Sequence, residues 1–403
     1  MIPFSPPRID DVTVAEVTAA LRSGWITTGP RTKKFEKEIT AYCGCRTTVA
    51  VNSWTTGMQV VLDWWGIGEG DEVIIPAYTY CACANVVLHS GAKPVMVDIN
   101  SEDFNLNVEK VKNAISPRTK AIMAVDVGGF PADYVKLNSL VRAPEIKDQF
   151  TANNALQKKL GRILLLADAA HSFGAKMDGA RSGLLADISS FSFHAVKNLT
   201  TAEGGALCFN LPERFNHEEI YASMCVKILH GQNKDALSKT QKGNWKYDVI
   251  EPGFKCNMTD IQAAIGLVEL SRYQENLDRR RKIFDKYDRA FGNEDWAITP
   301  LHLTDRKVSS YHLYLLRIKG ASESKRDQII QSIFEQDVAV NVHFQPLPLL
   351  TAYKKRGYSI DDYPEAYTKY ANEISLPVYF DLTDDQVDIV IKAVKTAVQN
   401  CMR

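Results

Sequence analysis

Ser190-Phe-Ser-Phe-His-Ala-Val-Lys197-Asn-Leu-Thr-Thr-Ala-Glu-Gly-Gly205 is the stretch that decides the fold of this chain. Its alternating apolar start, with Phe191 and Phe193, predicts a strand that enters a core and ends just before Lys197. A lysine held against apolar surroundings has a lowered pKa, so more of it is the neutral amine that attacks a carbonyl to form a Schiff base. A lysine on a surface loop is the alternative for any single lysine.

A second polar residue follows a strand upstream. Ile163-Leu-Leu-Leu-Ala167 is wholly apolar, as in a parallel strand buried on both faces, and it ends at Asp168. Open α/β sheets build their sites at the carboxyl ends of such strands. A carboxylate there suits the pyridinium nitrogen of pyridoxal phosphate (PLP), which it keeps protonated so that the ring can take up electrons. Asp168 as the cap of a following helix explains the same pattern.

Together these motifs resemble the signature of the PLP-dependent nucleotide-sugar aminotransferases of the DegT/DnrJ/EryC (StrS) type. Its parts are Asp168-Ala-Ala-His171 and the Ser190–Gly205 stretch. Further matches along nearly the whole chain are Ser23-Gly-Trp-Ile-Thr-Thr-Gly-Pro30, Pro76-Ala-Tyr-Thr-Tyr80, Pro252-Gly-Phe-Lys-Cys-Asn257-Met-Thr-Asp-Ile-Gln-Ala-Ala264 and Ser375-Leu-Pro377. The resemblance implies the aspartate-aminotransferase fold type I, an α/β fold whose large domain has a mainly parallel sheet and whose smaller C-terminal domain is α+β.

The resemblance also implies roles for single residues. Lys197 would hold the cofactor as a Schiff base and move the proton, Asp168 would pair with the ring nitrogen, and His171 would fix the ring. The residues expected to bind the cofactor are Trp54, Thr55, Tyr80, Asp168, His171, Ser192, Lys197 and Asn257. Those expected to contact substrate are Trp25, Thr28 and His343.

The phosphate of the cofactor has its own expected site. Small hydroxyl residues lie between a strand at 47–51 and a helical pattern that starts at Met58, and a helix N-terminus there suits a phosphate, although a plain N-cap looks the same. The resemblance places Trp54, Thr55 and the hydroxyl of Ser192 at the phosphate, with Tyr80 stacked on the ring. Trp54 stands where a small residue is common, which a backbone contact tolerates.

Asn257 is implied to reach the phosphate of the other subunit in a homodimer with shared active sites. Lys255 occupies a position where some relatives have that asparagine. Pro348 stands where many relatives have a second histidine near the sugar nucleotide, so the identity of the substrate is left open while the chemistry is not affected.

The chain alternates strands and helices, which predicts a parallel sheet with helices on both faces. Further strands are expected at 72–75, 94–98, 121–126 and 206–209, and helices at 11–22, 107–115, 132–142 and 214–229. Two domains are expected, a PLP-binding domain at 12–275 and a small domain at 276–403. A helical stretch from Thr259 to about Ala290 links them, with Arg279-Arg-Arg-Lys282 as a solvated face. In the small domain, strands are expected at 311–318 and 338–344 and helices at 323–336 and 385–398. Two segments of the large domain are expected to lie outside its core: 143–160 as polar surface, and 231–250 as a long loop over the site or toward a partner.

The reaction implied is transfer of an amino group from glutamate to a nucleotide-linked keto sugar. The closest local matches resemble the C4 aminotransferases that act on UDP-linked 4-keto sugars, including the 4-amino-arabinose branch, whose products serve polysaccharide or glycolipid synthesis. A C3 aminotransferase acting on a 3-keto-6-deoxy sugar stays open. Two further alternatives are a PLP-dependent sugar dehydratase, which has histidine in place of Lys197, and a non-enzymatic sugar- or cofactor-binding regulator, which would have lost Lys197 or Asp168.

Composition excludes other classes. Basic and acidic residues number 48 each, so no electrostatic case exists for nucleic acid or an anionic membrane. No apolar run approaches the roughly 20 residues of a membrane span, and the start lacks a signal peptide, so a cytoplasmic protein is expected. The eight cysteines are expected to be free thiols. The spacing of Cys43-Gly-Cys45 and of Cys81-Ala-Cys83 is too short for a zinc site, so no metal is expected.

Overall fold

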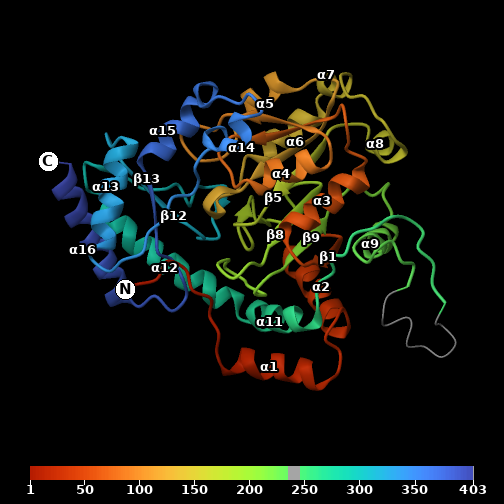
Figure 1. Ribbon diagram of the computed structural model, residues 1–403, viewed down its shortest axis with the longest axis horizontal. Helices are drawn as coiled ribbons and strands as arrows, with labels where there is room; N and C mark the ends of the chain where they lie inside the picture. The colour runs from red at the N-terminus through yellow and green to blue at the C-terminus, as the bar shows by residue number, and fades with distance from the viewer. Residues whose placement is uncertain (235–245, 403) are drawn as a thin grey trace.

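A seven-stranded sheet is the centre of the computed structural model, which describes residues 1–234 and 246–402 (Figure 1). Its strand order is β1-β9-β8-β5-β4-β2-β3. The strands are β1 (Thr47–Val51), β2 (Glu72–Pro76), β3 (Lys93–Val97), β4 (Thr119–Val125), β5 (Leu164–Asp168), β8 (Ile188–Ser192) and β9 (Gly205–Phe209). Strand β9 pairs antiparallel with both β1 and β8, and every other pairing in the sheet is parallel. The predicted mainly parallel sheet is confirmed.

This topology gathers the polar residues that follow the strands. Because all strands except β9 run the same way, the segments after β1, β2, β5 and β8 emerge at one edge of the sheet. Strand β9 runs in the opposite direction, so its first residue, Gly205, lies at that same edge. The sheet alone therefore brings Trp54, Tyr80, Asp168 and Lys197 toward one another.

Helices cover both faces of the sheet, and side chains of one strand alternate between two core clusters. Leu164 and Leu166 of β5 belong to the first cluster and Leu165 to the second. Burial on both faces explains the continuous apolar run that predicted this strand. The helices on the first cluster include α3 (Trp54–Trp65), α4 (Ala82–His89), α8 (Ala155–Leu160) and α9 (His217–Lys227). Those on the second include α2 (Pro30–Cys43), α5 (Val108–Ala114), α6 (Tyr134–Arg142), α7 (Pro144–Lys147) and α11 (Asp260–Ser271).

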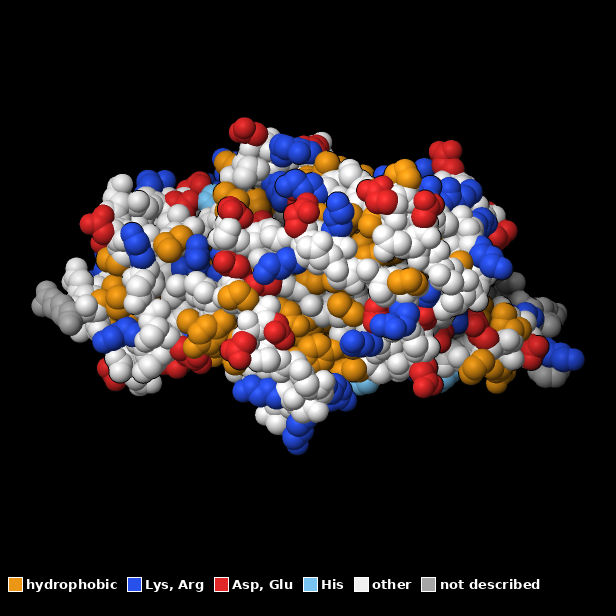
Figure 2. Space-filling view, turned by 90° about the horizontal axis from the view of Figure 1, so that it is seen from above, with side chains coloured by type: hydrophobic (Ala, Val, Ile, Leu, Met, Phe, Trp, Pro, Cys, Tyr) orange, Lys and Arg blue, Asp and Glu red, His pale blue; other side chains and the backbone are white. Residues whose placement is uncertain are grey.

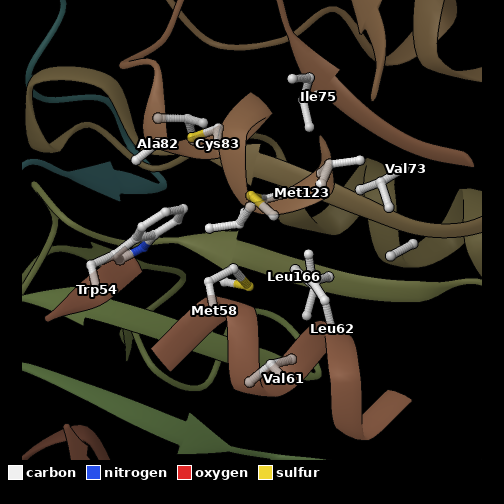
Figure 3. Close-up of a cluster of buried hydrophobic side chains, with 14 of the residues drawn as sticks. Trp54, Met58, Val61, Leu62, Val73, Ile75, Ala82, Cys83, Met123 and Leu166 are labelled. Carbon is white, nitrogen blue, oxygen red and sulfur yellow. The ribbon is translucent and has the colours of Figure 1, made fainter. Parts of the chain in front are cut away.

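Helix α3 begins at Trp54, earlier than the expected start at Met58. The hydroxyl of Ser53 caps it by accepting a hydrogen bond from the N–H of Thr56 at 3.2 Å. Figure 3 shows Met58 and Leu62 of this helix on the side that faces the sheet, in the cluster that includes Leu166. The early start places Trp54 and Thr55 in the first turn of the helix, which matters for the site.

The C-terminal part forms a separate α+β layer (Figure 1). Its sheet comprises β10 (Ala297–Ile298), β12 (Tyr314–Ile318) and β13 (Glu373–Leu376), and its helices include α12 (Tyr273–Phe291), α13 (Glu323–Phe334) and α16 (Asp384–Cys401). The remaining elements are α1 (Asp11–Arg22), β6 (Lys176–Met177), β7 (Ala180–Arg181), β11 (Lys307–Val308), α14 (Thr351–Lys354), α15 (Pro364–Asn372) and three 3₁₀ turns at 127–129, 347–349 and 360–362. Ile2 packs into the third core cluster and pairs with Val338, so the N-terminus lies against this layer. The exact domain boundary at 275 stays a prediction.

The single helix expected over 259–290 was wrong, because it breaks at Arg272 into α11 and α12. The backbone of Arg272 is not helical, and its guanidinium pairs with Asp10 and Glu269. The solvated face expected at 279–282 was wrong for Arg280. That residue is buried and donates a hydrogen bond to the carbonyl of Val378 at 3.0 Å, which ties α12 to the segment that follows β13.

The strand expected at 338–344 was also wrong. Only isolated bridges form there, Ile2 with Val338 and Asn341 with Ser375, because the N–H of His343 bonds to a side chain, Glu373, and not to a neighbouring strand. The segment 143–160 is not merely polar surface, since it buries Ile146, Gln157 and Leu160. Of the loop expected at 231–250, residues 235–245 lie outside the described residues.

Basic and acidic side chains are interspersed over the face shown in Figure 2. None of the helices within 1–234 and 246–402 combines the length and apolar character needed to cross a bilayer. Within the same ranges, no three acidic, histidine or cysteine side chains lie close enough together to hold a metal.

Candidate active site

A cavity of about 470 Å³ lies at the edge of the sheet where the strand-end segments converge. Residues of the small layer close it from the other side. The expected site residues among its lining are Trp54, Thr55, Tyr80, Asp168, His171, Ser192, Lys197 and His343. The structure thus brings together eight of the eleven residues singled out from the sequence, and the volume is that of a small-molecule site.

Lys197 is presented by a closed loop after β8. The N–H of Phe193 bonds to the carbonyl of Gly204 at 2.9 Å, and the N–H of Thr201 bonds to the carbonyl of Phe193 at 2.9 Å, so the loop leaves and re-enters the sheet at one place. Desolvation by the cavity walls lowers the pKa of Lys197 to about 8, and attraction to Asp168 works against that fall. No hydrogen bond or ion pair holds the amine of Lys197 within the described residues, so the amine is available to a ligand.

Asp168 ends β5 with its carboxylate buried beneath the cavity. One oxygen accepts the N–H of Ala170 at 3.1 Å, and the other accepts the thiol of Cys83 at 2.9 Å. Burial raises the pKa of this carboxyl, while the thiol and the N–H oppose the rise by bonding to the charged form. Cys83 was not expected at the site. Its place on α4, far from Asp168 in sequence, carried no local signal.

His171 lies in a stack of rings. Its ring is 5.7 Å from that of Phe344 with an interplanar angle of 20°, and 4.4 Å from that of His312. The N–H of Gly128 donates to Nδ1 of His171 at 3.3 Å, so the neutral ring carries its proton on Nε2. Burial and the nearby charge of Lys197 hold the pKa of His171 well below its usual value. His312 and Phe344 come from the small layer and were missed, because they follow no strand of the main sheet.

The N-terminus of α3 lies at one end of the cavity, where the cofactor phosphate is expected. Ser53 caps the N–H of Thr56, and in the described part of the chain no acceptor bonds to the N–H groups of Trp54 and Thr55. Free N–H groups at the positive end of a helix bind an anion. The indole of Trp54 packs into the first core cluster (Figure 3), so this bulky residue leaves its backbone N–H free.

Gly205 lets the start of β9 approach this helix end. A Cβ atom there would lie 2.7 Å from the carbonyl oxygen of Phe191 and 2.9 Å from both the carbonyl carbon of Ser53 and the nitrogen of Trp54. The glycine at this point of the signature is therefore explained by close packing of three backbone segments.

Gly205→Ala is accordingly expected to weaken binding of PLP by about tenfold or more, because it displaces the N–H groups that would bond to the phosphate. The overpacking should also lower the free energy of unfolding by about 1–3 kcal/mol. Titration of the apoprotein with PLP and urea denaturation measure the two effects. Gly68→Ala is the control, since its nearest neighbour would lie 3.9 Å away. Unchanged PLP affinity in Gly205→Ala would contradict this account of the helix end.

Three expected residues lie outside the cavity lining. Asn257 donates to the hydroxyl of Thr28 at 2.6 Å, and that hydroxyl donates to the carbonyl of Met258 at 2.6 Å. Asp260 then holds the adjoining start of α2 by accepting the N–H groups of Gly29, Arg31 and Thr32. Trp25 precedes this cluster. The roles expected for Trp25, Thr28 and Asn257 stay predictions, and the structure shows that Thr28 and Asn257 act as one unit.

The N-terminal segment contributes to the cavity as well, which the sequence did not indicate. Phe4 stacks on His343 with ring centroids 5.5 Å apart, and the hydroxyl of Ser5 donates to the carbonyl of Val196 at 3.2 Å. Both line the cavity. No motif marks them, because their position depends on the pairing of Ile2 with Val338.

The residues present fit PLP. A free amine faces the cavity for its aldehyde, a buried carboxylate lies beneath for its ring nitrogen, and uncapped helix N–H groups lie at one end for its phosphate. The three parts come from β5, the loop after β8 and α3, which the sheet holds in a fixed relation.

Comparison with known proteins agrees with a site for PLP. The family model of the DegT/DnrJ/EryC1/StrS aminotransferases matches residues 7–395. The Methanocaldococcus jannaschii protein MJ1066 is 38% identical over 400 residues, 98% of this chain and 97% of that protein. The Bacillus subtilis spore coat polysaccharide biosynthesis protein SpsC is 36% identical over 402 residues, 99% of this chain and 97% of that protein.

Solved structures extend the likeness to three dimensions. The PMP form of Spr1654 from Streptococcus pneumoniae, proposed to be a sugar aminotransferase, has a TM-score of 0.96 and 45% identity, and covers 100% of both chains. The same protein has been solved in a PLP form. Since the sequence match runs from residue 7 to 395 and the structural likeness spans the chain, this protein belongs to the DegT/DnrJ/EryC1/StrS aminotransferase family.

Proposed function

We propose that this protein, a PLP-dependent transaminase, moves the amino group of glutamate to the keto group at C4 of a nucleotide-linked sugar. The observation that carries the proposal is the free amine of Lys197 in one cavity with the buried carboxylate of Asp168. The likeness to a spore coat polysaccharide biosynthesis protein supports an amino-sugar product destined for a polysaccharide or glycolipid. The local match of residues 23–30 to the C4 branch supports the position of the amino group.

The chemistry divides between cofactor and chain. When bound, PLP supplies an aldehyde that captures amino groups and a ring that takes up the electrons of a breaking C–H bond. Lys197 would be the amine that anchors it, and in its neutral form the base that takes the proton from the α-carbon of the donor and delivers it to C4′ of the cofactor. A pKa of about 8 leaves an appreciable fraction of Lys197 neutral near pH 7.

The other lining residues orient and exclude water. The carboxylate of Asp168, held by Ala170 and Cys83, presents negative charge to a protonated ring nitrogen. The stacked rings of His171 and Phe344 form an aromatic wall of the cavity that would exclude water from the ring of the cofactor. We assign Tyr80, whose side chain is 61% exposed at the cavity, the stacking contact with the ring.

We further propose a homodimer with shared sites. Asn257 and Thr28 form a hydrogen-bonded pair outside the lining of their own cavity, and Trp25 precedes Thr28 in the same loop, which suits a contribution of these residues to the cavity of a partner. Helix α1 and the following loop expose Val12, Leu21 and Ile26, apolar side chains that a partner would cover. The partner's contribution to the phosphate site is the role foreseen for Asn257.

An absorbance spectrum tests the function directly. The visible band of the lysine-bound cofactor should disappear when glutamate is added and return with one member of a panel of UDP- and dTDP-linked 4-keto and 3-keto sugars. Return with a 4-keto sugar supports the proposal, and return only with a 3-keto sugar would replace C4 by C3. A protein that shows no band after PLP is added would overturn the proposal altogether.

A further inference from the structure

A chain of hydrogen bonds lies behind His343, on the side away from the cavity. Nδ1 of His343 is 2.9 Å from the hydroxyl of Ser375, and that hydroxyl is 2.6 Å from Oε1 of Glu373. The other oxygen, Oε2, accepts the backbone N–H of His343 at 2.9 Å. The three residues therefore form a closed loop that links β13 to the cavity wall.

Glu373 is enclosed without an ion-pair partner in the described part of the chain. Both Glu373 and Ser375 are 0% exposed, and neither lines the cavity. Among the described residues no cation lies within ion-pairing distance of Glu373, since the nearby guanidinium of Arg326 donates to the carbonyls of Tyr370 and Glu373 itself. A buried carboxylate in such a place is costly and takes up a proton instead. In agreement, burial raises the pKa of Glu373 to about 8.

A protonated Glu373 dictates the direction of every bond in the chain. Because Oε2 is occupied as an acceptor, the acid proton sits on Oε1. The Ser375 hydroxyl would donate to Oε1 of an ionised Glu373, whereas the acid O–H of a protonated Glu373 donates to the hydroxyl oxygen of Ser375. Ser375 has a single hydroxyl proton, which it then donates to Nδ1 of His343. Burial and the charge of Lys197 lower the pKa of His343 to about 3, so its ring is neutral and carries one proton. That proton must be on Nε2.

The side chain of His343 makes no further hydrogen bond within residues 1–234 and 246–402. The described residues offer no acceptor to Nε2, while the residue lines the cavity together with Lys197. Phe4 stacks on the ring and Phe344 meets it edge-on with centroids 5.3 Å apart, so the ring cannot turn freely. A rigid, neutral donor on a cavity wall is how a site recognises an oxygen atom of its ligand.

We propose that Glu373 and Ser375 are positioning residues that fix the proton of His343 on Nε2, so that His343 donates a hydrogen bond to a keto or hydroxyl oxygen of the acceptor sugar. The ligand named here rests on the proposed function, whereas the proton position does not. The sequence assigned no function to the Ser375-Leu-Pro377 motif, and this proposal gives Ser375 the function of positioning the proton of His343.

Nitrogen NMR of the full, PLP-loaded chain with ¹⁵N-labelled histidine tests the proton position. His343→Gln identifies the signals of this ring among those of the eight histidines. We expect the proton on Nε2 in the natural protein and in Glu373→Gln, whose amide N–H replaces the acid O–H. Glu373→Met and Ser375→Ala interrupt the series of hydrogen bonds, so in these variants the proton of His343 should no longer prefer Nε2. A proton on Nδ1 in the natural protein would overturn the inference.

Kinetics test the contact with substrate. Ser375→Ala should raise KM for the keto sugar by about 3- to 10-fold, the worth of one hydrogen bond, while the rate at which glutamate removes the cofactor band stays within twofold. Glu373→Gln should keep the KM of the natural protein, whereas Glu373→Met should raise it. Ser189→Ala is the control, because it removes a buried hydroxyl that has no partner in the described part of the chain.

The outcomes separate the two proposals. A displaced proton with an unchanged KM for the sugar would overturn the assigned contact. If no keto sugar reacts with the natural protein, the proposed function fails, while the NMR result on Glu373 and Ser375 stands by itself. If Ser375→Ala does not fold, Glu373→Met tests the same chain of bonds.

Discussion

Lys197→Ala is expected to abolish transamination and to remove the visible band of the lysine-bound cofactor at the same time. The proposed function gives this residue two roles, covalent anchor and base, so turnover should fall by at least about 10⁴-fold. PLP should still bind weakly through the helix end and Asp168. Steady-state assays and absorbance spectra of the same preparation measure both losses. Added methylamine should restore part of the proton transfer, because it supplies a small amine to the space that the side chain leaves.

Two further variants test whether the effect of Lys197→Ala comes from the loss of the amine, and not from the loss of a positive charge or of a buried lysine. Lys197→Arg keeps the positive charge but cannot act as a base, so it should be as inactive as Lys197→Ala. Lys369 is another buried lysine whose pKa falls to about 8, yet it lies outside the cavity and donates to the carbonyl of Ser101. Lys369→Met should lose stability and keep the band. Retention of turnover or of the band in Lys197→Ala would refute the assignment.

Asp168→Asn should retain PLP and slow transamination by about 10²- to 10⁴-fold. The amide preserves the volume of the side chain but cannot present negative charge to a protonated ring nitrogen, so the ring loses its capacity to take up electrons. Turnover assays and the absorbance of bound PLP measure the two properties separately. Full activity in this variant would show that another group protonates the ring.

The same variant changes the pH dependence of cofactor capture in a defined direction. Only neutral Lys197 attacks the aldehyde, so the rate at which the apoprotein takes up PLP should rise with pH and level off above about 8. Asp168 raises the pKa of Lys197, so removal of its charge should move this midpoint to lower pH.

Asp126→Asn is the matched control for this shift. Asp126 is a buried acid next to the end of β4, it accepts the hydroxyl of Tyr134 at 2.9 Å, and it does not line the cavity. Its loss should lower stability and leave the midpoint for Lys197 in place. An unchanged midpoint in Asp168→Asn would contradict the coupling between acid and amine.

The places of Asp168 and Lys197 were expected from one physical regularity, whereas the family resemblance implied the other site residues. Apolar runs such as 163–167 predicted buried parallel strands, and the polar residue that follows such a strand must lie at the edge where parallel strands end. Asp168 and Lys197 follow this rule, and the structure places both at the cavity. Arg280 and the segment 338–344 were misjudged, because local charge and local apolar pattern do not report what another part of the chain packs against them.

The sequence by itself determined the mainly parallel sheet, the order of its strands along the chain and the acid and amine at two strand ends, because short-range patterns within each segment carry this information. The family resemblance, and no local pattern, assigned the helix end after β1 to the phosphate. Only the tertiary structure decided that Cys83 bonds to Asp168, that Phe4 covers His343 and that Glu373 lies buried behind it. Hydrogen bonds between distant residues, and the desolvation that changes their protonation, exist only after the layers have packed, so no local pattern encodes them.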